Sequence, residues 1–399
     1  MPARQSTAVP KIDERRALKL ILELLQFPGL PGHETKILKH IEKRLRAAGA
    51  PAGSIAYDNA NKKSPAGGEI GNLIFKLPGT IDAPRRLFMG HVDTVPLCFG
   101  AKPVKRGEYI VSADPKTGLG GDNRSGAGAI LYTALEILEK KLPHPPLTFL
   151  WPIEEEIGLY GARFVDVKKL GNPKLCFNWD GGAPNKVIIG ATGAYRMQIE
   201  VKGLASHAGV APEKGVSAIA IAGLAIADLA KNGWHGLVQR NGTRGTSNIG
   251  VLKGGDATNV VTDRVTLRAE ARSHDSKFRK TLMEQFRKSF LNAAQAIKNA
   301  EGKRGSVDFH AELHYESFKL PENSPPVVEA RRVVSKLGMT PEISIANGGL
   351  DANWMSAHGL PTVTLGAGQQ EVHTVKERLH LDSFYKGCAV ALSLATATE

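Results

Sequence analysis

The sequence predicts an α/β domain with a central, mostly parallel sheet, interrupted by an inserted α+β domain. Short apolar runs alternate with helical segments of roughly 10–18 residues at both ends of the chain, which is the order of a parallel α/β sheet. From about residue 190 the pattern changes to a β-α-β-β-α-β order, which is typical of a ferredoxin-like sandwich. The α/β pattern resumes after Pro321. We therefore expect one discontinuous domain, residues 1–190 and 317–399, and one inserted domain, residues 191–316.

The N-terminal part of the α/β domain is predicted from helical spacing and from apolar runs. Apolar residues at helical spacing predict helices over Ile12–Leu25, Glu34–Ala48 and Arg124–Lys141. Asp13 suits the start of the first helix, and Pro143 ends the last. Short, largely apolar runs predict strands over Asn72–Lys76, Arg86–Met89, Leu147–Trp151 and Leu175–Trp179.

The inserted domain and the C-terminal part are predicted in the same way. In the insert we expect strands over Tyr195–Lys202, Thr246–Leu252, Val265–Ala271 and Val307–Tyr315, and helices over Ala211–Ala230 and Lys277–Asn299. After the insert we expect helices over Pro325–Leu337, Leu350–Ala357 and Leu379–Ala395, and strands over Glu342–Ala346 and Thr362–Leu365.

Composition excludes several classes of protein. The 399 residues include 52 Lys and Arg against 39 Asp and Glu, a formal charge of +13. Because the basic residues are spread along the chain, we interpret this charge as a solvated surface, with polyanion binding as the alternative.

Cys98, Cys176 and Cys388 lie too far apart to suggest a disulfide framework, which favours a reducing compartment. No apolar run reaches the about 20 residues of a membrane span, and residues 1–16 lack the apolar core of a secretory signal. We therefore expect a cytoplasmic protein with no membrane partner and no nucleic-acid partner.

Three clusters of potential metal ligands lie near predicted strand ends or helix starts. His91 and Asp93 follow the strand Arg86–Met89, where α/β sheets place their binding crevice, although such a triplet also arises by chance. Asp122 stands between a glycine-rich loop and a helix, so it either binds metal or caps the helix. Glu154–Glu156 follow another buried strand, where carboxylates suit metal binding and proton transfer; a solvated acidic turn is the alternative.

Two further residues complete the set. Asp180 precedes two glycines at a strand end, and His373 lies in a loop near the C-terminus, four residues before Glu377. Each alone suits an ordinary turn or loop. Taken together, imidazole and carboxylate ligands suit Zn²⁺, Co²⁺ or Mn²⁺. Because no cysteine belongs to the set, the pattern argues against a structural zinc finger.

Five ordered motifs run through nearly the whole chain: FMGHVDTVP, GLGGDNRSGAGAI, IEEEIGLYGA, NWDGG and GQQEVHT. Together they resemble the dinuclear zinc metallopeptidase family that includes peptidase T, glutamate carboxypeptidase and acetylornithine deacetylase. Residues 348–368 are most similar to peptidase T and its relatives. The resemblance implies two Zn²⁺ per subunit, with Co²⁺ or Mn²⁺ as alternatives, and an inserted domain that serves as a lid and for homodimer formation.

The resemblance also implies a role for each matching residue. The implied metal ligands are His91, Asp122, Glu156, Asp180 and His373, with Asp122 bridging two ions. Asp93 would orient His91, and Glu155 would be the general base. Because Glu154 precedes this pair, a register shift of one residue would reassign the roles. The Asp122–Asn123 bond is expected to be a cis peptide.

Residues of the insert complete the implied site. His207, in a GxxxHxG motif, would stabilise the oxyanion, often in the partner subunit, and Asn259 and Arg272 would contact the substrate. A charge that covers a strand edge is the alternative role for Arg272. We therefore expect a di-zinc aminopeptidase that hydrolyses short peptides, as a tripeptidase does. An N-acyl amino-acid deacylase or a carboxypeptidase is the enzymatic alternative, because the metal ligands do not separate these activities. A basic module that binds polyanions is the non-enzymatic alternative.

Overall fold

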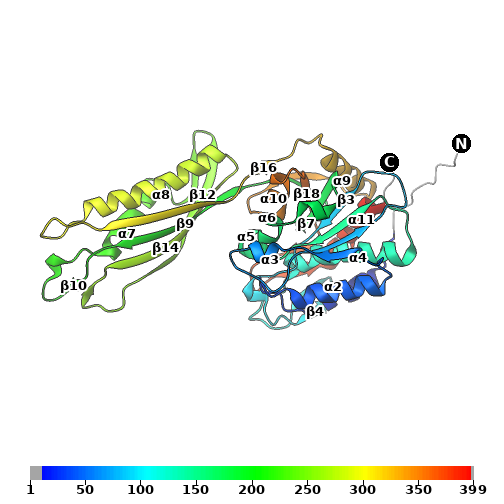
Figure 1. Ribbon diagram of the computed structural model, residues 1–399, viewed down its shortest axis with the longest axis horizontal. Coiled ribbons are helices and arrows are strands. Elements are labelled where there is room, and N and C mark those ends of the chain that lie inside the picture. Colours follow the sequence, from blue (N-terminus) through cyan, green and yellow to red (C-terminus); the bar gives the residue numbers. More distant parts are fainter. Residues whose placement is uncertain (1–10, 397–399) are drawn as a thin grey trace. The chain divides into compact units, whose positions relative to one another are not determined.

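The computed structural model describes residues 11–396. It divides the chain into two compact units, drawn in Figure 1: unit 1 comprises Met1–Ala191 and Lys319–Glu399, and unit 2 comprises Thr192–Phe318. Most of the N-terminal segment considered above for a secretory signal lies outside the described residues. No helix among the described residues has both the length and the apolar character that a membrane crossing requires.

Unit 1 is built around a nine-stranded sheet, counted over the described residues, in the order β1-β2-β6-β3-β7-β18-β8-β16, with β17 paired to β8. These strands are β1 Ile55–Tyr57, β2 Leu73–Leu77, β3 Arg86–Met89, β6 Leu147–Trp151, β7 Leu175–Gly181, β8 Lys186–Ala191, β16 Phe318–Lys319, β17 Glu342–Ala346 and β18 Thr362–Gly366. Strand β3 runs parallel to β6 and β7, and β18 runs parallel to β7. The mostly parallel central sheet predicted from the sequence is therefore confirmed.

Helices and a second small sheet cover this core. The helices of unit 1 are α1 Glu14–Leu24, α2 Thr35–Ala47, α3 Ala60–Lys63, α4 Gly121–Lys140, α5 Glu155–Gly158, α6 Tyr160–Arg163, α9 Pro325–Lys336, α10 Asp351–Ala357 and α11 Leu381–Thr396. Helix α4 packs against β7 and is covered in turn by α1 and α11. The small sheet has the order β19-β20-β5-β4, with β19 Gln369–Gln370, β20 Arg378–His380, β5 Tyr109–Ser112 and β4 Pro103–Arg106.

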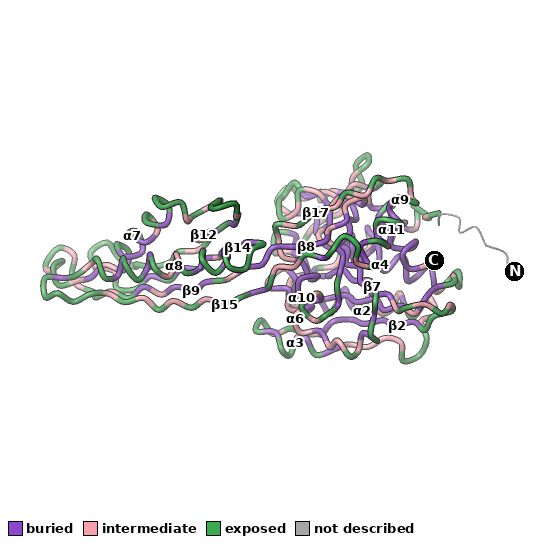
Figure 2. The backbone as a smooth tube through the Cα atoms, turned by 90° about the horizontal axis from the view of Figure 1, so that it is seen from above, coloured by how far each residue is buried: buried purple, intermediate pink, exposed green. Residues whose placement is uncertain are grey.

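Aromatic side chains fill the centre of the large sheet. The ring of Phe88 on β3 lies 5.5 Å, between centroids, from both Phe149 on β6 and Trp179 on β7. Strands β3 and β6 are buried along their whole length, and the buried tube of Figure 2 runs through this sheet and α4. Burial on both faces explains why these strands have apolar runs rather than alternating polar and apolar residues.

Unit 2 has two helices on one face of a five-stranded antiparallel sheet with the order β11-β12-β14-β9-β15. Its elements are β9 Gly193–Lys202, β10 Ser206–His207, α7 Ala218–Lys231, β11 Gly236–Arg240, β12 Thr243–Gly254, β13 Val260–Val261, β14 Arg264–Ser273, α8 Ser276–Ala296 and β15 Ser306–Tyr315. Leaving aside the edge strand β11, the strand order matches a ferredoxin-like sandwich, so this prediction is confirmed.

Two predicted helices begin later than expected. The helix predicted over Ala211–Ala230 starts at Ala218, because Pro212–Lys214 form a separate 3-10 turn and Ser217 caps α7 by accepting a hydrogen bond from the backbone N–H of Ala220. The helix predicted from Leu379 starts at Leu381, because Arg378–His380 pair with β5 as strand β20.

Candidate metal centre

The predicted ligands of unit 1 converge at one edge of the large sheet. His91 follows β3, Glu155 and Glu156 follow β6, and Asp180 lies near the end of β7. Because these three strands are parallel neighbours, their carboxyl ends meet at the same edge, as expected for a binding crevice in an α/β sheet. Asp122 arrives at this edge from the first turn of α4.

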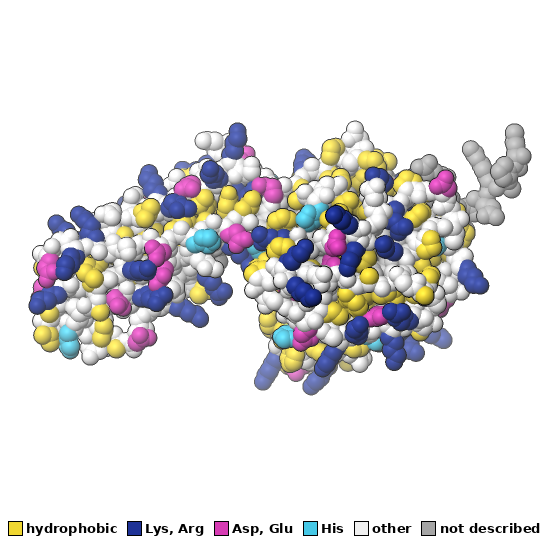
Figure 3. Space-filling model, in the orientation of Figure 1, with side chains coloured by type: hydrophobic (Ala, Val, Ile, Leu, Met, Phe, Trp, Pro, Cys, Tyr) yellow, Lys and Arg dark blue, Asp and Glu magenta, His cyan; other side chains and the backbone are white. Residues whose placement is uncertain are grey.

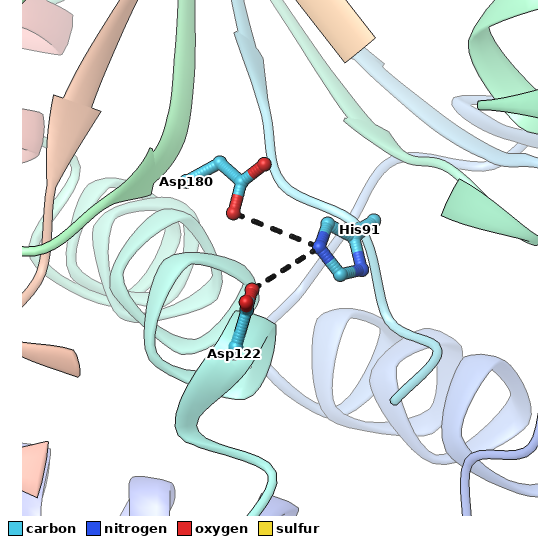
Figure 4. A group of neighbouring side chains, drawn as sticks. All are labelled: His91, Asp122 and Asp180. Atoms are coloured by element: carbon cyan, nitrogen blue, oxygen red, sulfur yellow. Dashed lines mark ion pairs between the residues drawn. The ribbon is translucent and has the colours of Figure 1, made fainter. Parts of the chain in front are cut away.

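His91 contacts carboxylates from two directions. Its Nε2 lies 3.5 Å from Oδ1 of Asp122 and 3.7 Å from Oδ1 of Asp180, and Figure 4 shows the three side chains pointing toward one another. Glu155 approaches the same Nε2 at 3.9 Å. The imidazole is almost completely buried. Within this cluster, the donor atoms of His91, Asp122 and Asp180 are close enough for one metal ion to bind all three.

His373 joins the other oxygen of Asp122. Its Nε2 lies 3.4 Å from Oδ2 of Asp122 and 3.1 Å from Oε2 of Glu156. Asp122 therefore places one oxygen near His91 and the other near His373. This is the arrangement that a carboxylate bridging two ions requires. The Asp122–Asn123 peptide is cis, as the resemblance implied.

Asp93 contacts two parts of the cluster. Its Oδ1 lies 3.4 Å from Nδ1 of His91, on the side of the ring opposite the other carboxylates. The two oxygens of Asp93 also accept hydrogen bonds from the backbone N–H groups of Glu155 and Glu156, both at 3.0 Å. Asp93 thus contacts both the ring of His91 and the turn that carries the two glutamates, which is the position expected of a residue that supports a metal ligand.

Glu154 lies apart from the cluster. Its side chain is buried, and its carboxylate accepts a hydrogen bond from the hydroxyl of Ser64. Glu155 and Glu156 instead belong to groups of donor atoms around His91 and His373. The geometry therefore favours the register in which Glu155 and Glu156, and not Glu154, belong to the cluster.

Burial and mutual repulsion perturb the titration of these groups. Burial raises the pKa of Asp180 to about 8, and the charge of Asp122 adds to this effect. Burial also raises the pKa of Glu155 well above its ordinary value. Hydrogen bonds with Asp122 and Glu156 raise the pKa of His373 to about 10. A cation binding here must displace protons from such groups, so metal affinity depends on pH.

The donor set fits two divalent cations. Among the described residues, three groups of side chains each have donor atoms that lie within 4.8 Å of one another. These groups are His91–Asp122–Asp180, Asp122–Glu156–His373 and His91–Glu155–Glu156. The first two groups share Asp122. The four carboxylates in these groups repel one another unless protons or cations neutralise them, and two divalent cations carry the matching charge. Mixed imidazole and carboxylate donors suit Zn²⁺, Co²⁺ or Mn²⁺.

The other predicted site residues belong to unit 2. His207, in β10, and Asn259 are exposed, and Arg272 lies in β14. The guanidinium of Arg272 donates two hydrogen bonds of 2.9 Å to Glu270. Because β14 is an inner strand, the alternative of a charge covering a strand edge is wrong for Arg272. The roles of these three residues toward substrate remain predictions.

Sequence reasoning assigned no role to three polar residues that lie near the ligands. Gln369 lies 3.3 Å from Asp122 and 3.5 Å from Asp180 through its Nε2. Asp351 is completely buried, and neither of its carboxylate oxygens has a hydrogen-bond partner. Glu377 contacts the loop that precedes Asp122. Gln369 and Asp351 lie within motifs that carried the resemblance, and Glu377 follows one of them, but a single sequence gave no pattern that separated them from loop residues.

Two models of peptidase families match this chain. The family model described as "Peptidase dimerisation domain" matches residues 189–298, and the model described as "Peptidase family M28" matches residues 72–213. The first match corresponds largely to unit 2, and the second includes His91, Asp122, Glu155, Glu156 and Asp180.

Individual relatives cover almost the entire chain. An uncharacterised protein, YqjE, of Bacillus subtilis is 31% identical over 96% of this chain and 98% of its own length. The crystal structure of a tripeptidase from Staphylococcus aureus matches with a TM-score of 0.84 and 31% identity, over 97% of this chain and 99% of that one. An aminopeptidase PepT from Bacillus cereus matches with a TM-score of 0.80 and 32% identity, over 96% of this chain and 98% of that one. The resemblance inferred from the five motifs is thereby confirmed, and the chain belongs to the M20/M28 peptidase family.

Proposed function

We propose that this protein is a di-metal aminopeptidase that hydrolyses short peptides in the manner of a tripeptidase. The observation that carries the proposal is the pair of donor groups that share Asp122. Glu155 lies beside His91, the histidine of the first group. The similar proteins from S. aureus and B. cereus are described as a tripeptidase and an aminopeptidase, which supports this substrate class.

Each residue of the centre has its own role in the proposed reaction. His91, Asp122, Asp180, Glu156 and His373 would hold two cations, which we expect to be Zn²⁺. When bound, the cations supply Lewis acidity toward the scissile carbonyl and toward water. Glu155 takes a proton from the attacking water at its carboxylate and delivers it to the leaving amine. Asp93 keeps His91 and the Glu155 turn in place.

Unit 2 contributes to the same proposal. His207 would stabilise the oxyanion, and Asn259 and Arg272 would bind the peptide. The match to a dimerisation domain supports a homodimer formed through this unit. We place the protein in the cytoplasm, and its three buried free cysteines agree with a reducing compartment.

Metal analysis and a substrate panel test the proposal. We expect two metal ions per chain by elemental analysis, loss of activity after treatment with a chelator, and recovery with Zn²⁺ or Co²⁺. Tripeptides, dipeptides and N-acetyl amino acids should then be compared, with mass spectrometry identifying the amide that breaks. Release of the N-terminal residue from tripeptides supports the aminopeptidase. Cleavage of N-acetyl amino acids alone would indicate the deacylase, and full activity of metal-free protein would exclude the hydrolytic centre.

The polyanion-binding alternative has weaker support. Lys and Arg side chains are scattered over both units on the face shown in Figure 3 and do not gather in one stripe. A solvated basic surface accounts for this distribution. Binding to DNA or RNA that weakens steeply with salt would revive the alternative.

A further inference from the structure

The carboxylate of Glu377 is buried at the start of α4, and a glycine-rich loop wraps around it. Its Oε2 accepts hydrogen bonds from the backbone N–H groups of Leu119 and Gly120, both at 2.8 Å. Its Oε1 accepts one from the backbone N–H of Asp122 at 2.9 Å, and the thiol of Cys98 donates to Oε2 at 3.3 Å. Both carboxylate oxygens are thus used, and the side chain is almost fully shielded from solvent.

The glycines around Glu377 make this close approach feasible. Gly120 has a φ of +80°, a conformation that strains other residues. A Cβ at position 118 would lie 2.8 Å from the Cys98 sulfur and 3.0 Å from Oε2 of Glu377. The Gly118–Gly121 loop therefore has a role beyond flexibility, because its small residues let three backbone N–H groups point at one carboxylate.

Glu377 also belongs to the loop that carries His373. The hydroxyl of Thr374 donates to the carbonyl of Glu371 and accepts from the backbone N–H of Lys376, and the backbone N–H of Glu377 donates to the carbonyl of Thr374. This series of local bonds makes residues 371–377 one compact turn. His373 and Glu377 therefore belong to the same hydrogen-bonded turn, and Glu377 accepts a hydrogen bond directly from the backbone of Asp122.

We propose that Glu377 is a positioning residue that sets the separation of Asp122 and His373, and so builds the second cation position of the centre. The inference rests on the proposed metal ligands, and it adds a residue that positions two of them without binding metal itself. Asp122 and His373 come from segments about 250 positions apart in the sequence, and the ion that they share with Glu156 needs their donor atoms within a few tenths of an ångström of the correct distance. The side chain of Glu377 joins their two loops by direct hydrogen bonds to the backbone of Leu119, Gly120 and Asp122.

The variant Glu377→Gln tests this role. The amide has one acceptor oxygen and turns an N–H₂ group toward backbone N–H groups that need an acceptor, so the two loops should separate. We expect the affinity for the second cation to fall about 10–100-fold, as is usual when a residue behind a metal ligand is changed. Binding of the first cation, through His91 and Asp180, should change less. Titration of the metal-free protein with Co²⁺, followed by calorimetry and visible absorption, measures both events.

A matched variant separates positioning from general stability. Glu371→Gln makes the same chemical change in the same turn, at an exposed side chain, and should leave both binding events as in the wild type. If Glu377 only caps α4, Glu377→Gln will lower the melting temperature while both Co²⁺ affinities and the absorption spectrum stay unchanged, and the proposal is then wrong. These measurements need no substrate, so they hold even if the peptidase assay fails. With a working assay, the KM of Glu377→Gln should stay near the wild-type value, while its kcat falls at limiting metal and recovers with excess metal.

Discussion

Glu155, the general base of the proposed reaction, lies 3.9 Å from His91, and its neighbour Glu154 offers a matched comparison. Glu155→Gln keeps the volume of the side chain but removes the base, so we expect kcat to fall about 10²–10⁴-fold with two cations still bound. Glu154→Gln should retain most of the activity, because Glu154 contacts Ser64 and not the cluster. Steady-state kinetics with metal analysis of both variants measures this. A greater loss in Glu154→Gln would move the general base by one residue.

Glu34 makes the stability of the protein depend on pH. It is completely buried, its Oε1 accepts hydrogen bonds from the backbone N–H groups of Gly32 and Glu154, and its Oε2 has no partner. Burial, aided by the charge of Asp93, raises the pKa of Glu34 from 4.5 to about 8. The folded protein therefore holds this proton more tightly than the unfolded chain does. The contribution to stability is complete below the unfolded pKa of 4.5 and is lost as pH rises through about 8.

The variant Glu34→Gln should remove this dependence. An amide oxygen can still accept both backbone hydrogen bonds, and no charge forms at high pH. We expect the free energy of unfolding to fall less between about pH 5 and about pH 9 in Glu34→Gln than in the wild type. Urea unfolding across this range measures the difference, with Glu322→Gln as a control at an exposed carboxylate. Identical pH profiles for wild type and Glu34→Gln would contradict the assignment.

Among the elements, the close packing of α4 on β7 decides where Asp122 lies. A Cβ at Gly126 of α4 would lie 2.1 Å from the carbonyl oxygen of Trp179 on β7, so the helix and the strand touch through their backbones. Gly126→Ala should push α4 away and separate Asp122 from Asp180. We expect a loss of about 1–3 kcal/mol in stability together with weaker metal binding.

A second glycine of α4 serves as the control for this variant. At Gly128 a Cβ would meet only side-chain ends, at 3.3 Å from Ile21 and 3.4 Å from Leu24. Gly128→Ala should therefore leave metal binding unchanged. Urea unfolding and metal titration of both variants give the comparison. Equal effects of the two variants would show that the contact of α4 with β7 does not control the position of Asp122.

The elements that could be predicted from the sequence are those with a strong apolar signal. Strands Arg86–Met89 and Leu147–Trp151 were predicted with their observed bounds because burial on both faces leaves continuous apolar runs. Strands Pro103–Arg106 and Tyr109–Ser112 were missed because they form a small, half-exposed sheet with no such run.

The same limit applies to the site. His91 and Asp180 lie at predicted strand ends, whereas the contact of Glu377 with the Asp122 loop joins distant segments that a single sequence does not connect.

For the whole molecule, unit 2 has an apolar helix face that suits a second copy of the chain. Ile219 and Leu224 on α7 are each 48% exposed, although the opposite face of this helix packs on the sheet. We expect light scattering to show a dimer and the variant Leu224→Arg to shift it to monomer, because a buried arginine charge is costly at an apolar interface. Val328→Arg, at a similarly exposed position on α9, should remain a dimer. A monomeric wild type would contradict the expectation.

The position of β18 in the large sheet has a consequence for biosynthesis. This strand, Thr362–Gly366, lies between β7 and β8, although both of those strands are translated before unit 2. Unit 2 is one continuous stretch of sequence and can fold as soon as it leaves the ribosome. The central sheet of unit 1 cannot be completed until β18 has been synthesised and placed between β7 and β8. His373 emerges later still. On the proposed ligand assignment, a nascent chain that has not yet reached His373 therefore lacks a complete set of metal ligands.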